Sequence, residues 1–353
     1  MKTPPRGLSR RDFLKLSGLG LLGLFVPARP FSHLTAPEAG LQTQTAANAQ
    51  GRVCARFLWA YDSPSSTGKR IKLYWRDLLV DIVGSASDED TTAYNRVWYE
   101  LPDGSYIYSG WVQPVRTILN PTITNIPIEG LLAEISVPYT DAYESPDPSS
   151  KVKHRLYYET THWVTASAPG ADGSAWYKLL DDKYNEYYYA PAAHVRVLSA
   201  SELSPLSPDF PAKDKRIEVH LNQQFVSAYE GARLVFAARA ATGAILRSGK
   251  YTTPSGTFST YLKRASRHMA AGDIAASGFD LPGVPWVLYL TESGISLHGT
   301  YWHNDFGHPR SHGCINLAPS AAKWLFRWTM PLVAPEKQYG IDRSKATTVL
   351  VMN

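Results

Sequence analysis

Apolar and polar residues alternate at the start of the segment that follows residue 212. Ile217, Val219 and Leu221 are separated by polar residues, residues 222–224 supply a polar turn, and Phe225 begins a second apolar run. A period of two is typical of a half-buried strand, and two such runs joined by a short polar turn are typical of a β-hairpin. The pattern therefore predicts a hairpin at the beginning of this segment.

The rest of the segment continues the same β pattern with one clear exception. Short apolar and β-branched runs lie at residues 234–236, 287–290, 295–297 and 347–351. The exception runs from Pro319 to about Met330, where Trp324, Leu325 and Trp328 recur at helical spacing and proline occupies the first turn. That spacing and that proline predict a helix whose tryptophans face the core. We therefore expect residues 213–353 to form a β-rich domain with a few short helices.

Two earlier stretches of the chain repeat one another. Ala60-Tyr-Asp-Ser-Pro precedes residues 69–75, and Ala142-Tyr-Glu-Ser-Pro precedes the similar residues 151–158. Each copy also ends on a related run, beginning at Trp98 in the first and at Trp176 in the second. Two matching landmarks indicate a tandem duplication.

Each copy consists of short runs rich in Tyr, Trp and Val that are interrupted by Gly, Pro, Asp and Ser. This composition predicts small β-barrels or meanders, which resemble bacterial SH3-like domains. We place the first repeat at residues 51–117 and the second at residues 130–199. Residues 200–212 are rich in Ser and Pro, lack periodicity, and are predicted to be a linker. The predicted fold class is mainly β.

The N-terminal 50 residues have the features of an export signal. Arg10-Arg11 precede an uncharged Leu- and Gly-rich run at residues 16–26, which is too short to span a bilayer as a helix. Twin arginine before a short apolar segment predicts recognition by the twin-arginine translocation machinery, followed by cleavage. Ala47-Asn48-Ala49 is a candidate cleavage site. A membrane-anchoring helix is the alternative.

Removal of this segment changes the charge of the protein. The full chain has a formal net charge of +5, of which the first 50 residues contribute six basic and two acidic side chains. The remainder is close to neutral, which disfavours nucleic acid as a partner. We expect an extracytoplasmic protein, in the cell wall or the periplasm.

Cys314, one of only two cysteines, lies in Ser311-His-Gly-Cys-Ile-Asn316. A thiol is a poor nucleophile until a neighbouring base or cation favours the thiolate, and histidine is suited to that task. His298, at the end of an apolar run, and His312 both qualify as that base. Gly313 permits a tight loop, so that the N–H groups of Gly313 and Cys314 could bind an oxyanion.

Several side chains near Cys314 are candidate substrate contacts, with loop packing as the alternative role for each: Tyr301, Trp302, Arg310, Ser311 and Asn316. Histidines 298, 303, 308 and 312 lie in the same region, but their spacing matches no zinc motif, and a metal would occupy the thiolate. We therefore expect no metal and no cofactor there. Cys54 is expected to be a small buried residue that forms no disulfide with Cys314.

These motifs together resemble the L,D-transpeptidase, or YkuD-type, catalytic domain of bacterial cell-wall enzymes. The resemblance extends from about Lys213 to the C-terminus and rests on four segments in order: Val219-His-Leu-Asn-Gln-Gln224, Thr253-Pro-Ser-Gly-Thr-Phe258, His298-Gly299 and Ser311-His-Gly-Cys-Ile-Asn316. It implies that Cys314 is the nucleophile and His298 the proton acceptor and donor. The Gly299 carbonyl would then orient His298, and His312 would have a supporting role.

The resemblance also implies a substrate and a reaction. Cys314 would form a thioester with the third residue of a peptidoglycan stem peptide, release D-alanine, and pass the acyl group to an amine on a second stem. The alternatives are an L,D-carboxypeptidase, another thiol hydrolase of the cell wall, and a wall-binding protein with an inactive C-terminal domain. The repeats would either bind the wall, including its glycan, or position the substrate, or serve only as a spacer.

Overall fold

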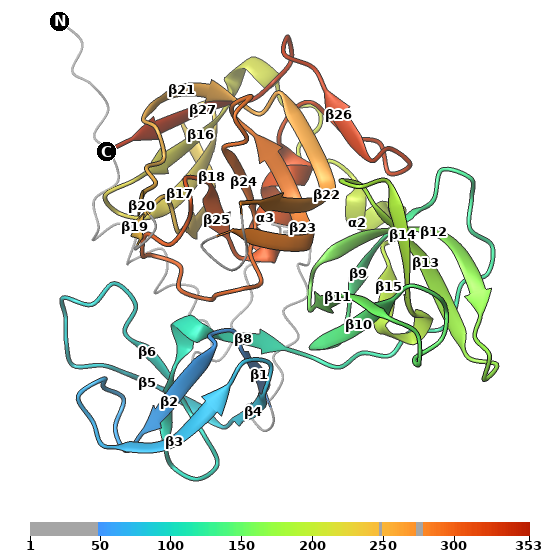
Figure 1. Cartoon of the computed structure of the whole chain (residues 1–353). Coiled ribbons are helices and arrows are strands. Elements are labelled where there is room, and N and C mark those ends of the chain that lie inside the picture. Colours follow the sequence, from blue (N-terminus) through green and yellow to red (C-terminus); the bar gives the residue numbers. More distant parts are fainter. Residues whose placement is uncertain (1–48, 247–248, 273–277) are drawn as a thin grey trace, which may run out of the picture. The chain divides into compact units, whose positions relative to one another are not determined.

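The computed structural model describes residues 49–246, 249–272 and 278–353 (Figure 1). The predicted export signal, and most of its candidate cleavage site, lie outside these residues. None of the helices in the described ranges is long and apolar enough to cross a membrane. Strands predominate throughout, as the hydrophobic pattern predicts.

The first repeat consists of two small antiparallel sheets, one of three strands and one of five. The first sheet has the order β4-β1-β8, and the second has the order β3-β2-β7-β6-β5. The strands are β1 (Ala49–Val53), β2 (Phe57–Tyr61), β3 (Arg70–Trp75), β4 (Leu79–Ile82), β5 (Gly84–Ser87), β6 (Val97–Glu100), β7 (Tyr106–Tyr108) and β8 (Val112–Val115). A 3-10 helix, η1 (Ser109–Trp111), joins β7 to β8. Val53, Ala60, Ile107 and Val112 are fully buried in a core of its own.

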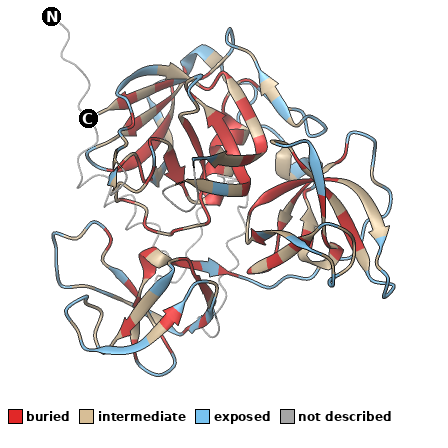
Figure 2. Cartoon of the chain, viewed as in Figure 1, coloured by how far each residue is buried: buried red, intermediate tan, exposed pale blue. Residues whose placement is uncertain are grey.

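The second repeat forms one seven-stranded sheet with the order β11-β10-β14-β13-β12-β9-β15. Its strands are β9 (Leu131–Ile135), β10 (Tyr139–Tyr143), β11 (Val152–Tyr157), β12 (Thr161–Pro169), β13 (Ala175–Asp181), β14 (Glu186–Pro191) and β15 (Val195–Val197). The 3-10 helix η2 (Ala192–His194) precedes β15. A separate apolar cluster lies within this repeat, and Figure 2 shows the buried positions of its strands in red.

The C-terminal domain contains two five-stranded sheets and two two-residue strands, β19 (Ile245–Leu246) and β20 (Gly249–Lys250). The first sheet, β18-β17-β16-β27-β21, includes the predicted hairpin: β16 (Lys215–His220) pairs antiparallel with β17 (Phe225–Glu230). This confirms the prediction from the alternating pattern. The other strands are β18 (Arg233–Arg239), β21 (Gly256–Ser259) and β27 (Thr348–Met352), which pairs parallel with β16.

The second sheet has the order β25-β24-β23-β22-β26. It comprises β22 (Leu262–Ala271), β23 (Phe279–Tyr289), β24 (Ser296–Gly299), β25 (Ile315–Leu317) and β26 (Tyr339–Ile341). The predicted helix is confirmed as α3 (Pro319–Trp328), which contacts β23 and β24. Trp328 is fully buried, and Trp324 stacks on it at 5.5 Å between ring centroids, so both tryptophans contribute to the core as predicted.

The segment predicted to be a linker contains two short helices. The helix α2 (Ala200–Leu203) begins at Ser199, whose hydroxyl accepts a bond from the Glu202 N–H while the Glu202 carboxylate accepts one from the Ser199 N–H. The 3-10 helix η3 (Ala212–Asp214) leads into β16. Leu203 and Leu206 pack on the core of the C-terminal domain. The leucines of this segment therefore pack on a core while its Ser and Pro residues are exposed, and the described residues from 49 onward belong to one compact unit.

Candidate active site

Two neighbouring parallel strands bring the predicted catalytic residues together. In the register of β24 and β25, Leu297 lies opposite Ile315 and His298 lies opposite Asn316. Side chains alternate between the two faces of a strand, so Leu297 and Ile315 face the apolar core. His298 and Asn316 therefore project from the opposite face. Cys314, directly before β25, shares that face with them.

Cys314 lies in a partly buried position beside several polar groups. Its Sγ is 3.7 Å from the Ser296 hydroxyl and 3.7 Å from the Gly294 carbonyl oxygen. Burial by itself would raise the pKa of the Cys314 thiol, but the hydrogen bond and charge of His298 and the bonds from Ser296 outweigh that effect. The pKa of Cys314 is consequently lower than that of an ordinary thiol, as a thiolate nucleophile requires.

The His298 ring is buried and held from one side. Its Nδ1 is 3.0 Å from the Gly299 carbonyl oxygen, which places a backbone acceptor at one ring nitrogen and leaves Nε2 for another partner. The Gly299 carbonyl thus orients the histidine ring, which is the task that the acid performs in a catalytic triad. Trp302 flanks the ring, with 5.7 Å between the ring centroids.

The loop before Cys314 is fixed by its own hydrogen bonds. Gly313 has φ = 114°, a conformation that favours glycine, and a Cβ there would lie 2.8 Å from a side-chain carbon of Ile295. The Ser311 hydroxyl donates to the Cys314 carbonyl at 2.5 Å and accepts from the Gly313 N–H at 3.1 Å. Thr253, from the second motif, donates to the Gly313 carbonyl at 2.8 Å.

These contacts bear on two of the predicted roles. The Gly313 N–H already has a partner in Ser311, so it could bind an oxyanion only by exchanging that bond. The Ser311 hydroxyl shapes the loop. The other predicted oxyanion donor, the Cys314 N–H, follows directly after this fixed turn.

His312 occupies a different environment from His298. It is exposed, its ring lies 4.4 Å from the Tyr251 ring between centroids, and partial burial lowers its pKa. The hydrogen bond that lowers the pKa of Cys314 comes from His298.

Asn316 belongs to a chain of polar contacts that leads away from Cys314. Its amide nitrogen is 3.0 Å from Nε2 of His303, whose Nδ1 accepts a bond from the Asp305 N–H at 3.2 Å. Burial lowers the pKa of His303 to about 3, so this ring is neutral at physiological pH. The buried Asp305 carboxylate accepts from Arg310 Nε at 2.6 Å and from the Tyr108 hydroxyl at 2.7 Å.

Tyr301 and Trp302 differ in how much of the ring is available to a ligand. Tyr301 is buried, its ring stacks on Tyr157 of the second repeat at 5.3 Å between centroids, and its hydroxyl donates to the Pro282 carbonyl at 3.3 Å. Its environment matches the loop-packing alternative. Trp302 is only partly buried beside His298 and stays a candidate substrate contact.

A pocket of about 780 Å³ contains this site. All the predicted site residues except Gly299 and Gly313 line it, together with side chains of both repeats. The repeat residues that line it include Arg52, Arg56, Arg76, Trp111, Lys153, His154, Arg155 and Tyr157. No local motif in the sequence links these repeat residues to the catalytic motifs, which lie more than a hundred positions further along the chain.

Arg52 shows how closely the first repeat approaches the catalytic residues. It is buried and donates to Asp77 at 2.9 Å, to Gln113 at 2.8 Å and to the Tyr301 carbonyl at 2.6 Å. The Gly110 carbonyl also accepts a bond from the Asn304 N–H at 2.9 Å. The first repeat thus supports the loop that follows Gly299.

Cys54 lies on the same pocket but has different chemistry. Both cysteines are free thiols in this structure. Cys54 is buried, its Sγ is 3.6 Å from the Tyr301 carbonyl oxygen, and burial raises its pKa. It is therefore the less reactive of the two thiols.

The C-terminal domain is thus a mainly β domain in which a thiol and a buried histidine lie on neighbouring strands. Residues 214–351 match the family model YkuD, the L,D-transpeptidase catalytic domain. That part of the chain is therefore a YkuD L,D-transpeptidase catalytic domain, as the motifs indicated. No curated protein sequence matches the chain significantly.

Solved structures of L,D-transpeptidases are similar to about two fifths of the chain. They include one from Mycobacterium smegmatis (20% identity, TM-score 0.32, 40% of this chain and 59% of that one). Another comes from Xylanimonas cellulosilytica, with 26% identity and a TM-score of 0.28 over 39% of this chain and 60% of that one. A third, from Enterococcus faecium, has 23% identity and a TM-score of 0.31 over 40% of this chain and 50% of that one. The matched part thus spans between half and three fifths of these proteins.

Proposed function

We propose that this protein is an exported cysteine L,D-transpeptidase that cross-links third-position residues of peptidoglycan stem peptides. The observation that carries the proposal is the arrangement of Cys314, His298 and the Gly299 carbonyl inside the matched domain. The lowered pKa of Cys314 and the 3.0 Å contact at His298 Nδ1 suit a nucleophile and its oriented base. The sequence-predicted export signal would place the enzyme in the same compartment as its substrate.

The first half-reaction forms a thioester. The Cys314 thiolate attacks the carbonyl carbon of the third stem residue, and the carbonyl oxygen becomes an oxyanion near the Cys314 N–H. His298, which has taken the thiol proton, gives that proton to the amine of the departing D-alanine. The C–N bond breaks, and the acyl group stays on sulfur. The Gly299 carbonyl keeps the ring oriented through both proton transfers.

The second half-reaction transfers the acyl group. An amine on the side chain of another stem attacks the thioester, His298 removes its proton, and the C–S bond breaks to restore the thiolate. The product is an amide between two third-position residues. When water attacks in place of the amine, the product is a shortened monomer, and the enzyme acts as a carboxypeptidase.

The experiment that tests the proposal is incubation of the purified protein with a disaccharide tetrapeptide, followed by mass spectrometry. A dimer that has lost one D-alanine is the expected product. A tripeptide monomer as the sole product would show that the enzyme hydrolyses the stem and does not transfer it. Unchanged substrate, together with binding to the wall, would show that the protein only binds the wall.

Two variants sharpen this test. Cys314→Ala should abolish turnover, because no other thiol approaches His298 in the described part of the chain. Cys54→Ala is the matched control and should keep turnover, since the Cys54 thiol is buried with a raised pKa. Turnover that survives in Cys314→Ala would contradict the mechanism.

A further inference from the structure

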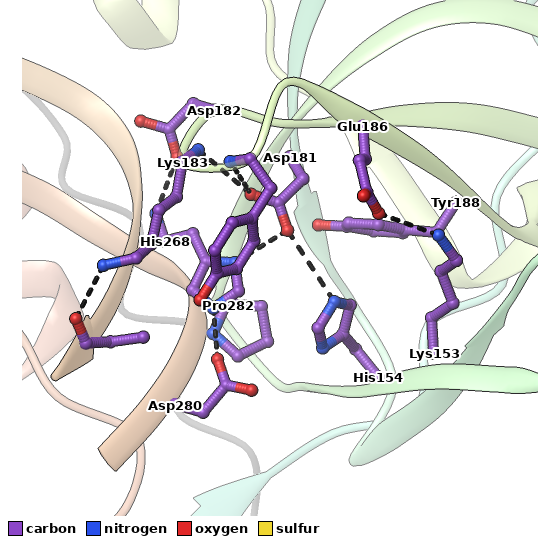
Figure 3. Close-up of polar contacts among 12 residues, drawn as sticks. Lys153, His154, Asp181, Asp182, Lys183, Glu186, Tyr188, His268, Asp280 and Pro282 are labelled. Atoms are coloured by element: carbon purple, nitrogen blue, oxygen red, sulfur yellow. Dashed lines mark hydrogen bonds and ion pairs between the residues drawn. The ribbon is translucent and has the colours of Figure 1, made fainter. Parts of the chain in front are cut away.

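A cluster of metal-ligating side chains lies where the second repeat meets the C-terminal domain (Figure 3). His154 comes from β11 and Asp181 from the end of β13, whereas His268 comes from β22. One potential ligand atom from each of the three lies within 4.8 Å of the other two. The nucleophile Cys314 and its base His298 are not members of this cluster.

The Asp181 carboxylate is oriented toward both histidines. Its Oδ1 accepts bonds from the N–H groups of Lys183 at 3.0 Å and Tyr184 at 3.2 Å. Its Oδ2 is 2.7 Å from His268 Nδ1 and 3.7 Å from His154 Nε2. The backbone thus fixes one oxygen and leaves the other facing two imidazole nitrogens.

His268 is held in the way that metal-ligating histidines usually are. Its Nε2 is hydrogen-bonded to the carboxylate of Asp280 on β23, while Nδ1 faces the centre of the cluster. A carboxylate on the remote ring nitrogen fixes the tautomer and orientation of a histidine ligand. Asp280 is therefore suited to be the outer partner in a carboxylate–histidine–metal arrangement.

The charges of the cluster match a divalent cation. Two carboxylates and two neutral imidazoles carry a charge of about −2, of which the buried Asp181 carboxylate most needs compensation, whereas Asp280 is exposed. The neighbouring cations are directed to other groups. Lys153 pairs with Glu186 at 2.9 Å and Arg267 with Asp182 at 2.7 Å, while the Lys183 ammonium donates to the Ala270 carbonyl at 2.6 Å. A proton on His268 compensates only half of the charge.

We propose that His154 Nε2, Asp181 Oδ2 and His268 Nδ1 bind one divalent transition-metal ion, for which zinc is the best match. Zinc takes nitrogen and oxygen ligands at about 2.0–2.2 Å, which separates tetrahedral neighbours by roughly 3.3–3.6 Å. The distances of 2.7 and 3.7 Å from Asp181 Oδ2 bracket that range, and the two histidine ligand atoms lie within 4.8 Å of each other, so the side chains must rotate to close the site around an ion.

Such an ion would join the second repeat to the catalytic domain. Three protein ligands leave a fourth position for water or a ligand atom, and His154 and Asp280 both line the pocket that contains Cys314. Zinc would displace any proton between His268 and the carboxylates, so affinity should increase with pH.

The test measures zinc binding by isothermal titration calorimetry and by elemental analysis after dialysis. Every protein is the full chain carrying Cys314→Ala, so that the catalytic thiolate contributes no binding. We expect one zinc ion per chain and at least a tenfold loss of affinity in His154→Gln and in Asp181→Asn. His194→Gln, in the same repeat but outside the cluster, is the matched control and should bind as the parent does.

Asp280→Asn supplies a variant that keeps all three ligands. It should weaken zinc binding by about 10- to 100-fold, the usual effect of removing an outer carboxylate. Circular dichroism verifies that each variant is folded. Absence of zinc from the parent, or equal affinity in the parent, His154→Gln and Asp280→Asn, would overturn the proposal. The measurement is independent of transpeptidase activity.

Discussion

Cys314 and Cys54 line one pocket, yet their surroundings shift their thiol chemistry in opposite directions. Burial acts on both. At Cys314 the bonds from His298 and Ser296 outweigh burial and lower the pKa, whereas at Cys54 burial dominates and raises it. Because only a thiolate reacts efficiently with an electrophile, the two residues should differ in the pH at which they are alkylated.

We predict that iodoacetamide modifies Cys314 with a pH midpoint below the value of about 8.5 that is typical of a free thiol. His298→Gln removes the hydrogen bond and charge that favour the thiolate, so the midpoint should move upward. Mass spectrometry of digests labelled at a series of pH values measures both cysteines at once. Cys54 is the internal control and should react only at higher pH. An unchanged Cys314 midpoint in His298→Gln would contradict the assignment of His298 as the base.

The residues of the site were predictable to the extent that they lie in contiguous motifs. Cys314 and His298 each occupy a recognisable string, and one strand pair brings the strings together. Ser296 could not be singled out, because its proximity to Cys314 follows from the register of that pair. His154, Asp181 and His268 lie on three separate strands of two domains, so no spacing in the sequence indicates that they meet.

At the scale of elements, β22 was the largest omission from the predicted fold. Its buried positions include Lys263, Ser266 and His268, so the expected alternation of apolar and polar residues is obscured. Lys263 donates to the carbonyl groups of Phe326 at 2.6 Å and Thr329 at 2.8 Å, at the end of α3. A polar residue that is buried in order to bind the last carbonyl groups of a helix can therefore make its own strand difficult to predict from the sequence.

The segment after β24 depends on an element of the first repeat. Tyr108, at the end of β7, donates its hydroxyl proton to the buried carboxylate of Asp305 at 2.7 Å. Tyr108→Phe should destabilise the protein by about 2 kcal/mol, since a hydrogen bond to a charged group contributes about 1.5–3 kcal/mol. Urea denaturation measures this loss.

Tyr106→Phe on the same strand is the matched control, because Tyr106 is also half-buried. It should change the free energy of unfolding by less than about 0.5 kcal/mol. Equal effects of the two substitutions would show that the Asp305 contact contributes little to stability.

At the scale of the whole molecule, the sequence predicted modules separated by a linker, whereas the structure connects them extensively. Arg52 in the first repeat, Gln113 beside it, and Tyr158 in the second repeat are linked through hydrogen bonds to one another and to the Tyr301 carbonyl. Such contacts between distant segments follow from tertiary packing, which single-sequence patterns do not record. The Ser- and Pro-rich composition of residues 200–212 likewise gave no sign that Leu203 and Leu206 pack on the core.

This connectivity predicts cooperative unfolding. The repeats and the catalytic domain should melt in one calorimetric transition, with equal calorimetric and van't Hoff enthalpies. Arg52→Met removes the buried guanidinium at the junction and should lower the melting temperature or divide the transition. Three separate transitions in the parent protein would show that the modules are energetically independent.

The bond from Arg52 to the Tyr301 carbonyl constrains how such a protein can be rebuilt. Its acceptor is the peptide backbone, so the residue type at position 301 can change without altering the acceptor. Arg52, the donor, cannot be replaced as freely, because the bond requires a buried side chain that is long enough and bears N–H groups. A catalytic domain separated from the first repeat would therefore leave the Tyr301 carbonyl without this donor.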